Sequence, residues 1–412
     1  MKNYYKNLRC FNLLLLLMIF SGCQDKKNKD VSKDESSVEN NITISDSLKW
    51  SERMALSEMK RYPESWQIDN PEKPKWDYVH GLVLTAFEKL FDETEDTKYK
   101  EYIRDYADLL IDSTGTIATY KLEDYNIDMI VAGNILFDLY EDTKDEKYLK
   151  AMQMLKKQIE GQPRTKSGGF WHKKRYTNQM WLDGLYMGEP FYAHYTSKFE
   201  QGKNLDDVAK QFELIQKHAL DKKTGLLYHG WDESKEQKWA DKKTGVSPNF
   251  WSRSIGWYAM ALVDVLDYFP EHHPKHQELV SYLNQLAKAV VKVQHESGLW
   301  YQVPNMGDRE GNYLEASGTA MFAYSLAKGV NKGYLPEKYL EAANKAFDGM
   351  TRDLIKVDKD GVVTITQACA VAGLGGDPYR DGSYEYYVNE RKKDNDPKAT
   401  GPFILTALEL NK

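Results

Sequence analysis

Two kinds of segment with helical periodicity alternate along this chain, and their regular order limits the folds that it can adopt. Apolar segments are predicted to start near Trp76, Ile127, Trp181, Trp251, Gly318 and Pro402. Amphipathic segments are predicted to start near Asp46, Asp96, Asp145, Asn204, His273 and Leu335. An amphipathic helix buries one face, whereas an apolar helix requires neighbours all around it. We therefore expect an all-α (α/α)6 toroid, in which an outer ring of helices surrounds an inner ring. An open superhelix is the alternative.

Short segments in which glycine is followed by aromatic or β-branched residues recur between these helices. They are STGTIATY from Ser113, SGGFWHKK from Ser167, TGLLYHGW from Thr224, SGLWYQVP from Ser297 and DGVVTITQ from Asp360. Each follows an amphipathic segment and precedes an apolar one. The glycine is expected to end a helix, and the residues after it to form a short extended piece.

In such a toroid all inner helices run in the same direction, so their N-termini meet at one mouth. Free backbone N–H groups and the positive ends of the helix dipoles converge there. Tryptophans also concentrate in the predicted loops and helix starts, namely Trp76, Trp171, Trp181, Trp231, Trp251, Trp257 and Trp300. The sequence therefore predicts an aromatic-lined cleft at this mouth.

Two carboxylates lie at matching places in successive apolar helices. Asp128 is in YNIDMI and Asp183 is in QMWLDG. Bulky neighbours such as Trp181 would desolvate Asp183 and raise its pKa, and a carboxyl that stays protonated near neutral pH can act as a general acid. We predict Asp183 as the catalytic group and Asp128 as its partner, with Asp124 and Asp77 as weaker candidates. An ordinary helix-capping role is the alternative.

Cations and hydrogen-bond donors lie beside these acids in the sequence, at His172, Lys173, His229 and Arg253. Arg253 stands between two tryptophans at a helix start, a position suited to bidentate binding of a carboxylate. Its alternative is a structural ion pair with Asp264 or Glu189. The predicted substrate-binding set comprises His172, Lys173, Trp181, His229, Trp251, Arg253, Trp257 and Arg380, the last from a Gly- and Tyr-rich stretch after Ala368.

The N-terminus predicts export. Residues 1–22 combine a basic start with an apolar run too short to span a bilayer, as in a signal peptide. The ending Phe20-Ser21-Gly22-Cys23 resembles the bacterial lipobox. We therefore expect lipidation at Cys23 and a membrane-anchored lipoprotein that faces the periplasm or the cell surface. Plain secretion is the alternative. Residues 23–45 are polar and predicted to be a flexible tether, and residues 46–412 the catalytic domain.

Charge and cysteine content exclude several other classes. Removing residues 1–22 takes away three positive charges, which changes the formal net charge from −6 to −9, and this argues against a nucleic-acid partner. The cysteines Cys10, Cys23 and Cys369 allow no disulfide framework in the mature chain. No Cys/His cluster has zinc-site spacing, so neither a metal nor another cofactor is expected.

The run SGGFWHKKRYTNQMWLDGLYMGEPF resembles the signature of the unsaturated rhamnogalacturonyl hydrolases, glycoside hydrolase family 105, relatives of the family 88 unsaturated glucuronyl hydrolases. The similarity continues through YNIDMIVAGNIL, YHGWD, FWSRSIGWYAMAL and YLEASGTAMFAYSLAKGV. It implies an (α/α)6 barrel that removes a terminal 4,5-unsaturated uronic acid from rhamnose-containing oligosaccharides made by a polysaccharide lyase, of rhamnogalacturonan or ulvan type. It also implies that Asp183 is the general acid/base, that Asp128 assists, and that substrate contacts fall on His172, His229, Arg253 and Trp257.

The chemistry implied by this resemblance is hydration of the C4=C5 vinyl ether. Protonated Asp183 would deliver a proton to C4, and water would then add at C5, which requires no metal or redox cofactor. Two other classes stay open from the residues alone. One is a conventional inverting glycosidase that uses Asp128 and Asp183 as base and acid on saturated substrates. The other is a non-catalytic glycan-binding lipoprotein.

Overall fold

The computed structural model describes residues 43–412, within a compact unit formed by Ile42–Lys412. The predicted signal peptide, Cys23 and most of the predicted tether lie outside the described residues. The end of the tether prediction is wrong, because Ile44 is only 2% exposed and its backbone N–H donates to the carbonyl of Asp360 at 2.9 Å. The folded domain therefore already includes Ile44. Within residues 43–412, no helix has the length and apolar character needed to cross a bilayer.

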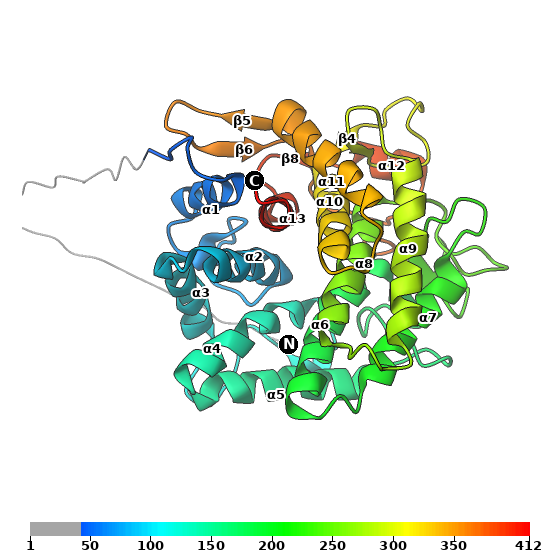
Figure 1. Ribbon diagram of the computed structural model, residues 1–412. Helices are drawn as coiled ribbons and strands as arrows, with labels where there is room; N and C mark the ends of the chain where they lie inside the picture. Colours follow the sequence, from blue (N-terminus) through cyan, green and yellow to red (C-terminus); the bar gives the residue numbers. More distant parts are fainter. Residues whose placement is uncertain (1–42) are drawn as a thin grey trace, which may run out of the picture. The chain divides into compact units, whose positions relative to one another are not determined.

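The inner ring consists of six helical segments (Figure 1). They are α2 (Tyr78–Thr94), the consecutive short helices η3 (Ile127–Met129), η4 (Val131–Ile135) and α4 (Leu136–Thr143), then α6 (Leu182–Phe199), α8 (Ser252–Val265), α10 (Ala316–Asn331) and α13 (Pro397–Glu409). Each segment packs against the next, and α13 packs against α2. The ring is therefore closed, which confirms the toroid and excludes the open superhelix.

The outer ring also has six helices, one packed on each inner segment. They are α1 (Trp50–Arg61), α3 (Thr97–Leu110), α5 (Glu146–Gly161), α7 (Leu205–Ala219), α9 (His276–Lys292) and α11 (Lys338–Gly349). Helices α3, α5, α7, α9 and α11 each pack on the inner segment that precedes them, whereas α1 packs on α13. The first outer helix therefore pairs with the last inner helix, as the closed ring requires.

The connections carry short strands and further short helices. Four antiparallel pairs form: β1 (Gln179–Trp181) with β2 (Gly230–Asp232), β3 (Trp300–Tyr301) with β4 (Leu314–Glu315), β5 (Ile355–Val357) with β6 (Val363–Ile365), and β7 (Ala368–Cys369) with β8 (Lys392–Lys393). The short helices are η1 (Ser65–Gln67), η2 (Leu122–Asp124), η5 (Leu266–Tyr268), η6 (Met350–Leu354) and α12 (Tyr384–Asn389).

The predicted glycine-led extended segments are present as tight turns. Isolated bridges join Ile111 to Ile117, Arg164 to Phe170 and Leu220 to Leu227. Gly298 shows why this residue type is required, because its φ of 95° lies in the left-handed region and a Cβ atom there would lie 2.1 Å from the carbonyl oxygen of Lys345. Each turn leads the chain from an outer helix back to the ring.

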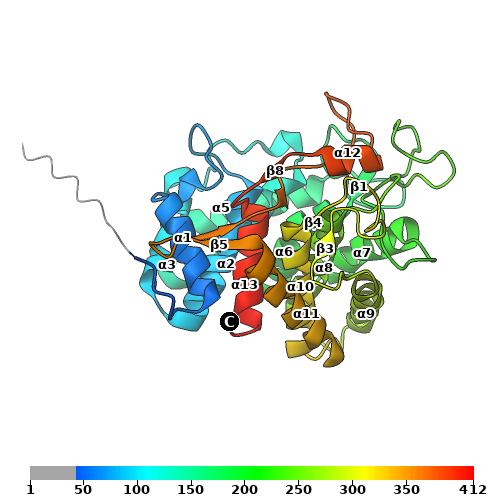
Figure 2. The same cartoon turned by 90° about the horizontal axis from the view of Figure 1, so that it is seen from above.

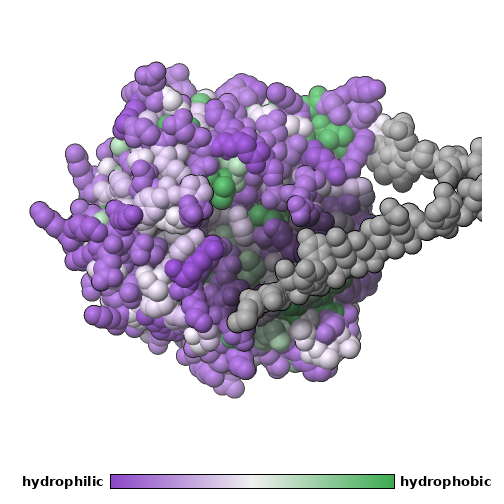
Figure 3. Space-filling view, turned by 180° about the vertical axis from the view of Figure 1, so that it is seen from behind, coloured by the Kyte–Doolittle hydropathy of each residue, from purple (hydrophilic) through white to green (hydrophobic). Residues whose placement is uncertain are grey.

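The loop-bearing side of the ring is the side on which the inner helices begin. Viewed from above, β1, β8 and α12 lie along one side, and the C-terminal end of α13 points to the opposite side (Figure 2). From behind, the surface is largely hydrophilic, and apolar residues are visible at the floor of a hollow (Figure 3).

Candidate active site

Pairing of β1 with β2 positions Asp183. Trp181 is opposite Gly230 in this pair, and the backbone N–H of Leu182 donates to the carbonyl of His229 at 3.0 Å. Helix α6 starts directly after the strand, so Asp183 falls in its first turn, as predicted. Two stretches distant in sequence are thereby fixed against each other, and His229 is placed beside the carboxylate.

Asp183 and His229 face each other closely without forming a regular hydrogen bond. His229 Nε2 lies 3.2 Å from Asp183 Oδ2, and both atoms are buried without a hydrogen-bond partner in the described part of the chain. The other ring nitrogen of His229, Nδ1, lies 2.7 Å from the hydroxyl of Tyr387. The Asp183 side chain is 14% exposed and lines a cavity. Its carboxyl group is thus available to a ligand.

Asp128 is positioned by a second cross-connection. Asn126 forms an antiparallel bridge with Lys173, and the N–H of Ile127 donates to the carbonyl of His172 at 3.2 Å. Asp128 lies in the short helix η3 that follows, where His172 Nε2 approaches its Oδ1 to 3.2 Å and the ammonium of Lys173 forms an ion pair with its Oδ2. These contacts attach Asp128 firmly to the segment that leads into β1.

The two carboxylates therefore have different surroundings. Burial raises the pKa of Asp128, but the charges and hydrogen bonds of Lys173 and His172 outweigh that effect and hold the pKa below its ordinary value. Asp128 is therefore an anion throughout the neutral range. Asp183 forms no ion pair with a lysine or arginine among residues 43–412, and His229 Nε2 lies 3.2 Å from its carboxylate. Environments that differ in this way are typical of carboxyl pairs that perform separate roles.

Nine of the ten predicted site residues line one cavity of about 250 Å³. They are Asp128, His172, Lys173, Trp181, Asp183, Trp251, Arg253, Trp257 and Arg380. The tenth, His229, is fully buried behind Asp183. The structure therefore brings together predicted residues from three inner helical segments, η3, α6 and α8, and from the loops of the same mouth.

Aromatic rings form one wall of the cavity, but fewer tryptophans take part than predicted. The indole of Trp181 stacks on His172 and Tyr176 at centroid distances of 4.6 and 4.7 Å. Trp251 and Trp257 also line the cavity, whereas Trp76, Trp171, Trp231 and Trp300 do not. Trp300 shows the reason, since its indole N–H donates to the carbonyl of Val290 at 2.7 Å inside the core. Tryptophans at helix starts therefore pack away from the cavity as often as they line it.

Hydrogen bonds to a side chain and to backbone carbonyls of the protein hold the Arg253 guanidinium in place. Its guanidinium donates to Ser317 Oγ at 2.7 Å and to the carbonyls of Cys369 and Ala370. Its ion-pair partner is Glu315, at 3.7 Å, so the alternative of an ion pair with Asp264 or Glu189 is wrong. The sequence analysis missed this pairing because it placed the start of the inner helix near Gly318, whereas Glu315 is the N-cap residue of α10, which packs on α8. Arg253 still lines the cavity, so its role in binding substrate stays a prediction.

Arg380 and Asp77 also have structural roles. Arg380 Nε donates to the carbonyl of Gly375 at 2.8 Å, and its Nη2 donates to the hydroxyl of Tyr176 at 3.0 Å, so it attaches its loop to the aromatic wall. Asp77 caps α2 by accepting from the N–H of Val79 at 3.2 Å. Asp77 is therefore explained as a cap, whereas Arg380 lies at the cavity.

Four polar residues of the cavity were not among the predicted set: Tyr78, Arg175, Tyr176 and Lys398. Lys398 is 5% exposed, and its ammonium lies 2.8 Å from Asp396 Oδ1. Burial and the charge of Arg253 lower its pKa, against the opposing effect of Asp396. It was missed because α13 begins at Pro397 and not near Pro402. A correct helix start would have placed Lys398 at the mouth with the other N-terminal residues.

An aromatic-walled cavity with two unlike carboxylates, at the N-terminal mouth of a helical toroid, has the features of a carbohydrate-cleaving site. Residues 50–412 match the sequence model of Glycosyl Hydrolase Family 88, so the chain belongs to that family and is a glycoside hydrolase.

Individual relatives agree with this assignment. A family 105 glycoside hydrolase from C. acetobutylicum has a structure that is 45% identical in sequence, with a TM-score of 0.85 over 88% of this chain and 99% of that one. The unsaturated rhamnogalacturonyl hydrolase YesR of Bacillus subtilis is 25% identical over 75% of this chain and 84% of its own length. An unsaturated 3S-rhamnoglycuronyl hydrolase of Alteromonas sp. is 25% identical over 56% of this chain and 50% of its own length.

Proposed function

We propose that this enzyme removes the terminal 4,5-unsaturated uronic acid from the non-reducing end of rhamnose-containing oligosaccharides produced by a polysaccharide lyase. The observation that carries the proposal is the pair of carboxyl groups in one cavity, with Asp128 held ionised and Asp183 free of any hydrogen bond at its buried oxygen within residues 43–412. The names of the relatives from B. subtilis and Alteromonas indicate the same class of substrate.

The charges that surround the cavity support an acidic substrate. Five cationic side chains line it, against the two carboxylates Asp128 and Asp183. These cations are Lys173, Arg175, Arg253, Arg380 and Lys398. The chain as a whole has a formal net charge of −6, so the excess of positive charge at the cavity is opposite in sign to the charge of the whole chain. It suits the carboxylate that every unsaturated uronic acid carries.

The proposed reaction begins at the vinyl ether and not at the glycosidic bond. The Asp183 carboxyl transfers its proton to C4, and the positive charge that develops at C5 and the ring oxygen is stabilised by the Asp128 anion. The resulting Asp183 carboxylate then accepts a proton from water as the water oxygen bonds to C5. The hemiketal formed in this way opens, and the remaining oligosaccharide leaves.

His229 is proposed to assist Asp183 during this exchange. The only partner of the Tyr387 hydroxyl within the described residues is His229 Nδ1, and burial together with nearby negative charge raises the pKa of Tyr387 well above its ordinary value. In the proposed arrangement the hydroxyl donates to Nδ1, so that the ring proton of His229 lies on Nε2, which faces Asp183. This proton can stabilise the Asp183 carboxylate after it has protonated the substrate.

The proposal is tested by following ultraviolet absorbance of lyase digests, because hydration of C4=C5 removes the conjugated chromophore of the unsaturated uronate. Digests of rhamnogalacturonan and of ulvan should be compared side by side, with saturated oligosaccharides of the same sugars as the control. Loss of absorbance in one or both digests is the expected result. Cleavage of the saturated substrates without loss of absorbance would instead indicate the conventional inverting glycosidase.

We further propose that the protein is an exported lipoprotein anchored through Cys23 and facing the periplasm or the cell surface, downstream of a lyase. The lipobox-like ending at Cys23 and the basic, apolar start of residues 1–22 support this. Growth with a labelled fatty acid should label the wild-type protein and not a Cys23→Ala variant. Equal labelling of both proteins, or of neither, would contradict the anchor.

A further inference from the structure

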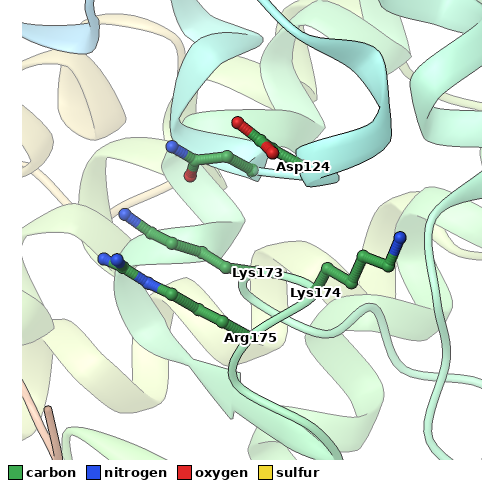
Figure 4. A pocket seen from close by; sticks show the side chains of 5 residues that line it. Asp124, Lys173, Lys174 and Arg175 are labelled. Carbon is green, nitrogen blue, oxygen red and sulfur yellow. The ribbon is translucent and has the colours of Figure 1, made fainter. Parts of the chain in front are cut away.

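The segment that contains Lys173, Lys174 and Arg175 presents its basic groups in two directions. The side chains of Lys173 and Arg175 extend to the same side, below Asp124, and Lys174 extends the opposite way (Figure 4). Lys174 donates to the carbonyl of Glu123 at 3.2 Å. All three residues line the cavity next to the catalytic one, but the ammonium of Lys174 is bound to the Glu123 carbonyl, so only the side chains of Lys173 and Arg175 extend together.

Those two cations differ in what they contact. Lys173 forms the ion pair with Asp128 described above. Arg175 is exposed and forms neither an ion pair nor a hydrogen bond with any residue between 43 and 412. Its guanidinium carbon lies 4.9 Å from the centre of the Tyr176 ring, and that ring in turn stacks on Trp181. Arg175 is thus supported by the aromatic wall, and its hydrogen-bond donors remain available.

Arg175 also lies where two cavities meet. It lines the catalytic cavity together with Lys173, and both residues line a neighbouring cavity of about 370 Å³. Asp124 and Asn126 lie on the other side of that second cavity. A terminal sugar bound at Asp183 occupies the first cavity, so the next sugar of the chain is expected to extend toward the second.

We propose that Arg175 binds an anionic group, a sulfate ester or a carboxylate, on the sugar beyond the scissile bond. This rests on the proposed function and specifies its substrate class. A planar guanidinium with free donors matches both anions in a bidentate manner. Asp124 is the one acid among the residues lining this second cavity, and it repels an anion, so the anionic group must bind on the side of Lys173 and Arg175.

The test uses matched substrates. One unsaturated uronyl disaccharide is prepared with a sulfate on its second sugar and also in desulfated form, and a third substrate carries an additional uronate beyond the bond. The variant Arg175→Gln keeps a side chain of similar polarity but loses the charge. Because Arg175 also contributes to the positive charge around the catalytic cavity, we expect Arg175→Gln to lower kcat/KM on every substrate to some extent. The fall should be at least about tenfold larger, and expressed in KM, on the substrate whose second sugar carries the recognised anion than on the desulfated disaccharide.

Two further variants separate charge from structure. Arg175→Lys keeps the charge and should recover part of the lost kcat/KM. Arg104→Gln makes the same change on the exposed face of α3 in the outer ring and should leave all substrates unaffected. A selective effect on the sulfated disaccharide assigns the site to sulfate, and one on the uronate-bearing substrate assigns it to carboxylate.

Different experimental results would contradict the anion-binding role of Arg175 and the proposed hydrolase function. Equal losses on charged and desulfated substrates in Arg175→Gln, or no loss on any, would overturn the anion subsite while the hydrolase activity stands. If the wild-type enzyme leaves the absorbance of every unsaturated substrate unchanged, the proposed function is overturned, and the subsite with it.

Discussion

His229 Nε2 lies 3.2 Å from Asp183 Oδ2, yet the two groups are not aligned for a regular hydrogen bond. The same histidine is held at Nδ1 by Tyr387 of helix α12, 158 residues further along the chain. Tyr387 orients the His229 ring through Nδ1, whereas Nε2 forms no regular hydrogen bond with Asp183. The contact between Nε2 and Asp183 can therefore strengthen as negative charge develops on the carboxylate. The geometry therefore suits a group that must be neutral at one stage of a reaction and anionic at the next.

This relationship predicts the effect of Tyr387→Phe. The variant removes the hydroxyl that places the His229 proton on Nε2, but the ring can still stack on Trp251, 5.9 Å away. A hydrogen bond of this kind is worth about 1 to 1.5 kcal/mol, so kcat should fall by roughly tenfold with little change in KM. Tyr384→Phe on the same helix is the control, because its hydroxyl binds the carbonyl of Arg309 and not a site residue. Equal kcat values for the wild type and Tyr387→Phe would contradict the positioning role.

The ion pair between Lys173 and Asp128 predicts a change in pH dependence. In the wild type the cation lowers the pKa of Asp128, so this group stays ionised far into the acid range. In Lys173→Met the pKa of Asp128 rises, since burial remains and only His172 still opposes it. Asp128 then becomes protonated at a higher pH, and the acid limb of kcat/KM should move to higher pH.

Kinetics across the acid range measure this shift. Lys288→Met removes a lysine from the exposed side of α9 and should leave the profile in place. An acid limb in Lys173→Met at the wild-type position would show that the ionisation of Asp128 does not control activity.

The buried pair of Arg253 and Glu315 predicts a stability effect. Glu315 is fully buried and accepts from the N–H groups of Ser317, Gly318 and Cys369. Glu315→Gln removes its charge and turns an amide N–H₂ group toward those donors, so we expect unfolding free energy to fall by about 3 kcal/mol. Urea unfolding measures the loss. Glu385→Gln, which breaks an exposed ion pair with Arg309, should cost less than about 1 kcal/mol. Similar values for the two variants would refute the structural role of the buried pair.

Periodicity in the sequence was sufficient to predict both rings, because burial on one face or on all faces leaves a pattern in the order of apolar residues. The start of α13 was misplaced for a local reason. Its first turn, Pro397-Lys398-Ala399-Thr400, follows a run of charged residues and lacks apolar periodicity, although Asp396 caps it and Pro397 suits the first position. Pro402 lies inside the helix. The start of a helix is difficult to predict from apolar periodicity when the first turn is polar.

The site could be predicted where function depends on local position, and not where it depends on contacts between distant loops. Asp128 and Asp183 stand at equivalent places in neighbouring inner helices, so their meeting follows from the ring. The pairing of Arg253 with Glu315 joins the starts of the adjacent inner helices α8 and α10, and it was missed because α10 was expected to start near Gly318. The pairing of His229 with Tyr387 depends on how the loop that carries α12 crosses the mouth, and no spacing in the chain encodes it. The opposite directions of Lys174 and Arg175 are likewise a property of one turn.

The most direct test of the account is the Asp183→Asn variant, assayed by loss of ultraviolet absorbance from an unsaturated oligosaccharide that the wild type consumes. Asparagine fits the same space but cannot deliver a proton. We expect a normal far-ultraviolet circular dichroism spectrum, an unfolding midpoint close to that of the wild type, and turnover reduced by at least about a thousandfold. Turnover within about tenfold of the wild type in a correctly folded Asp183→Asn protein would contradict the assignment of Asp183 as the proton donor.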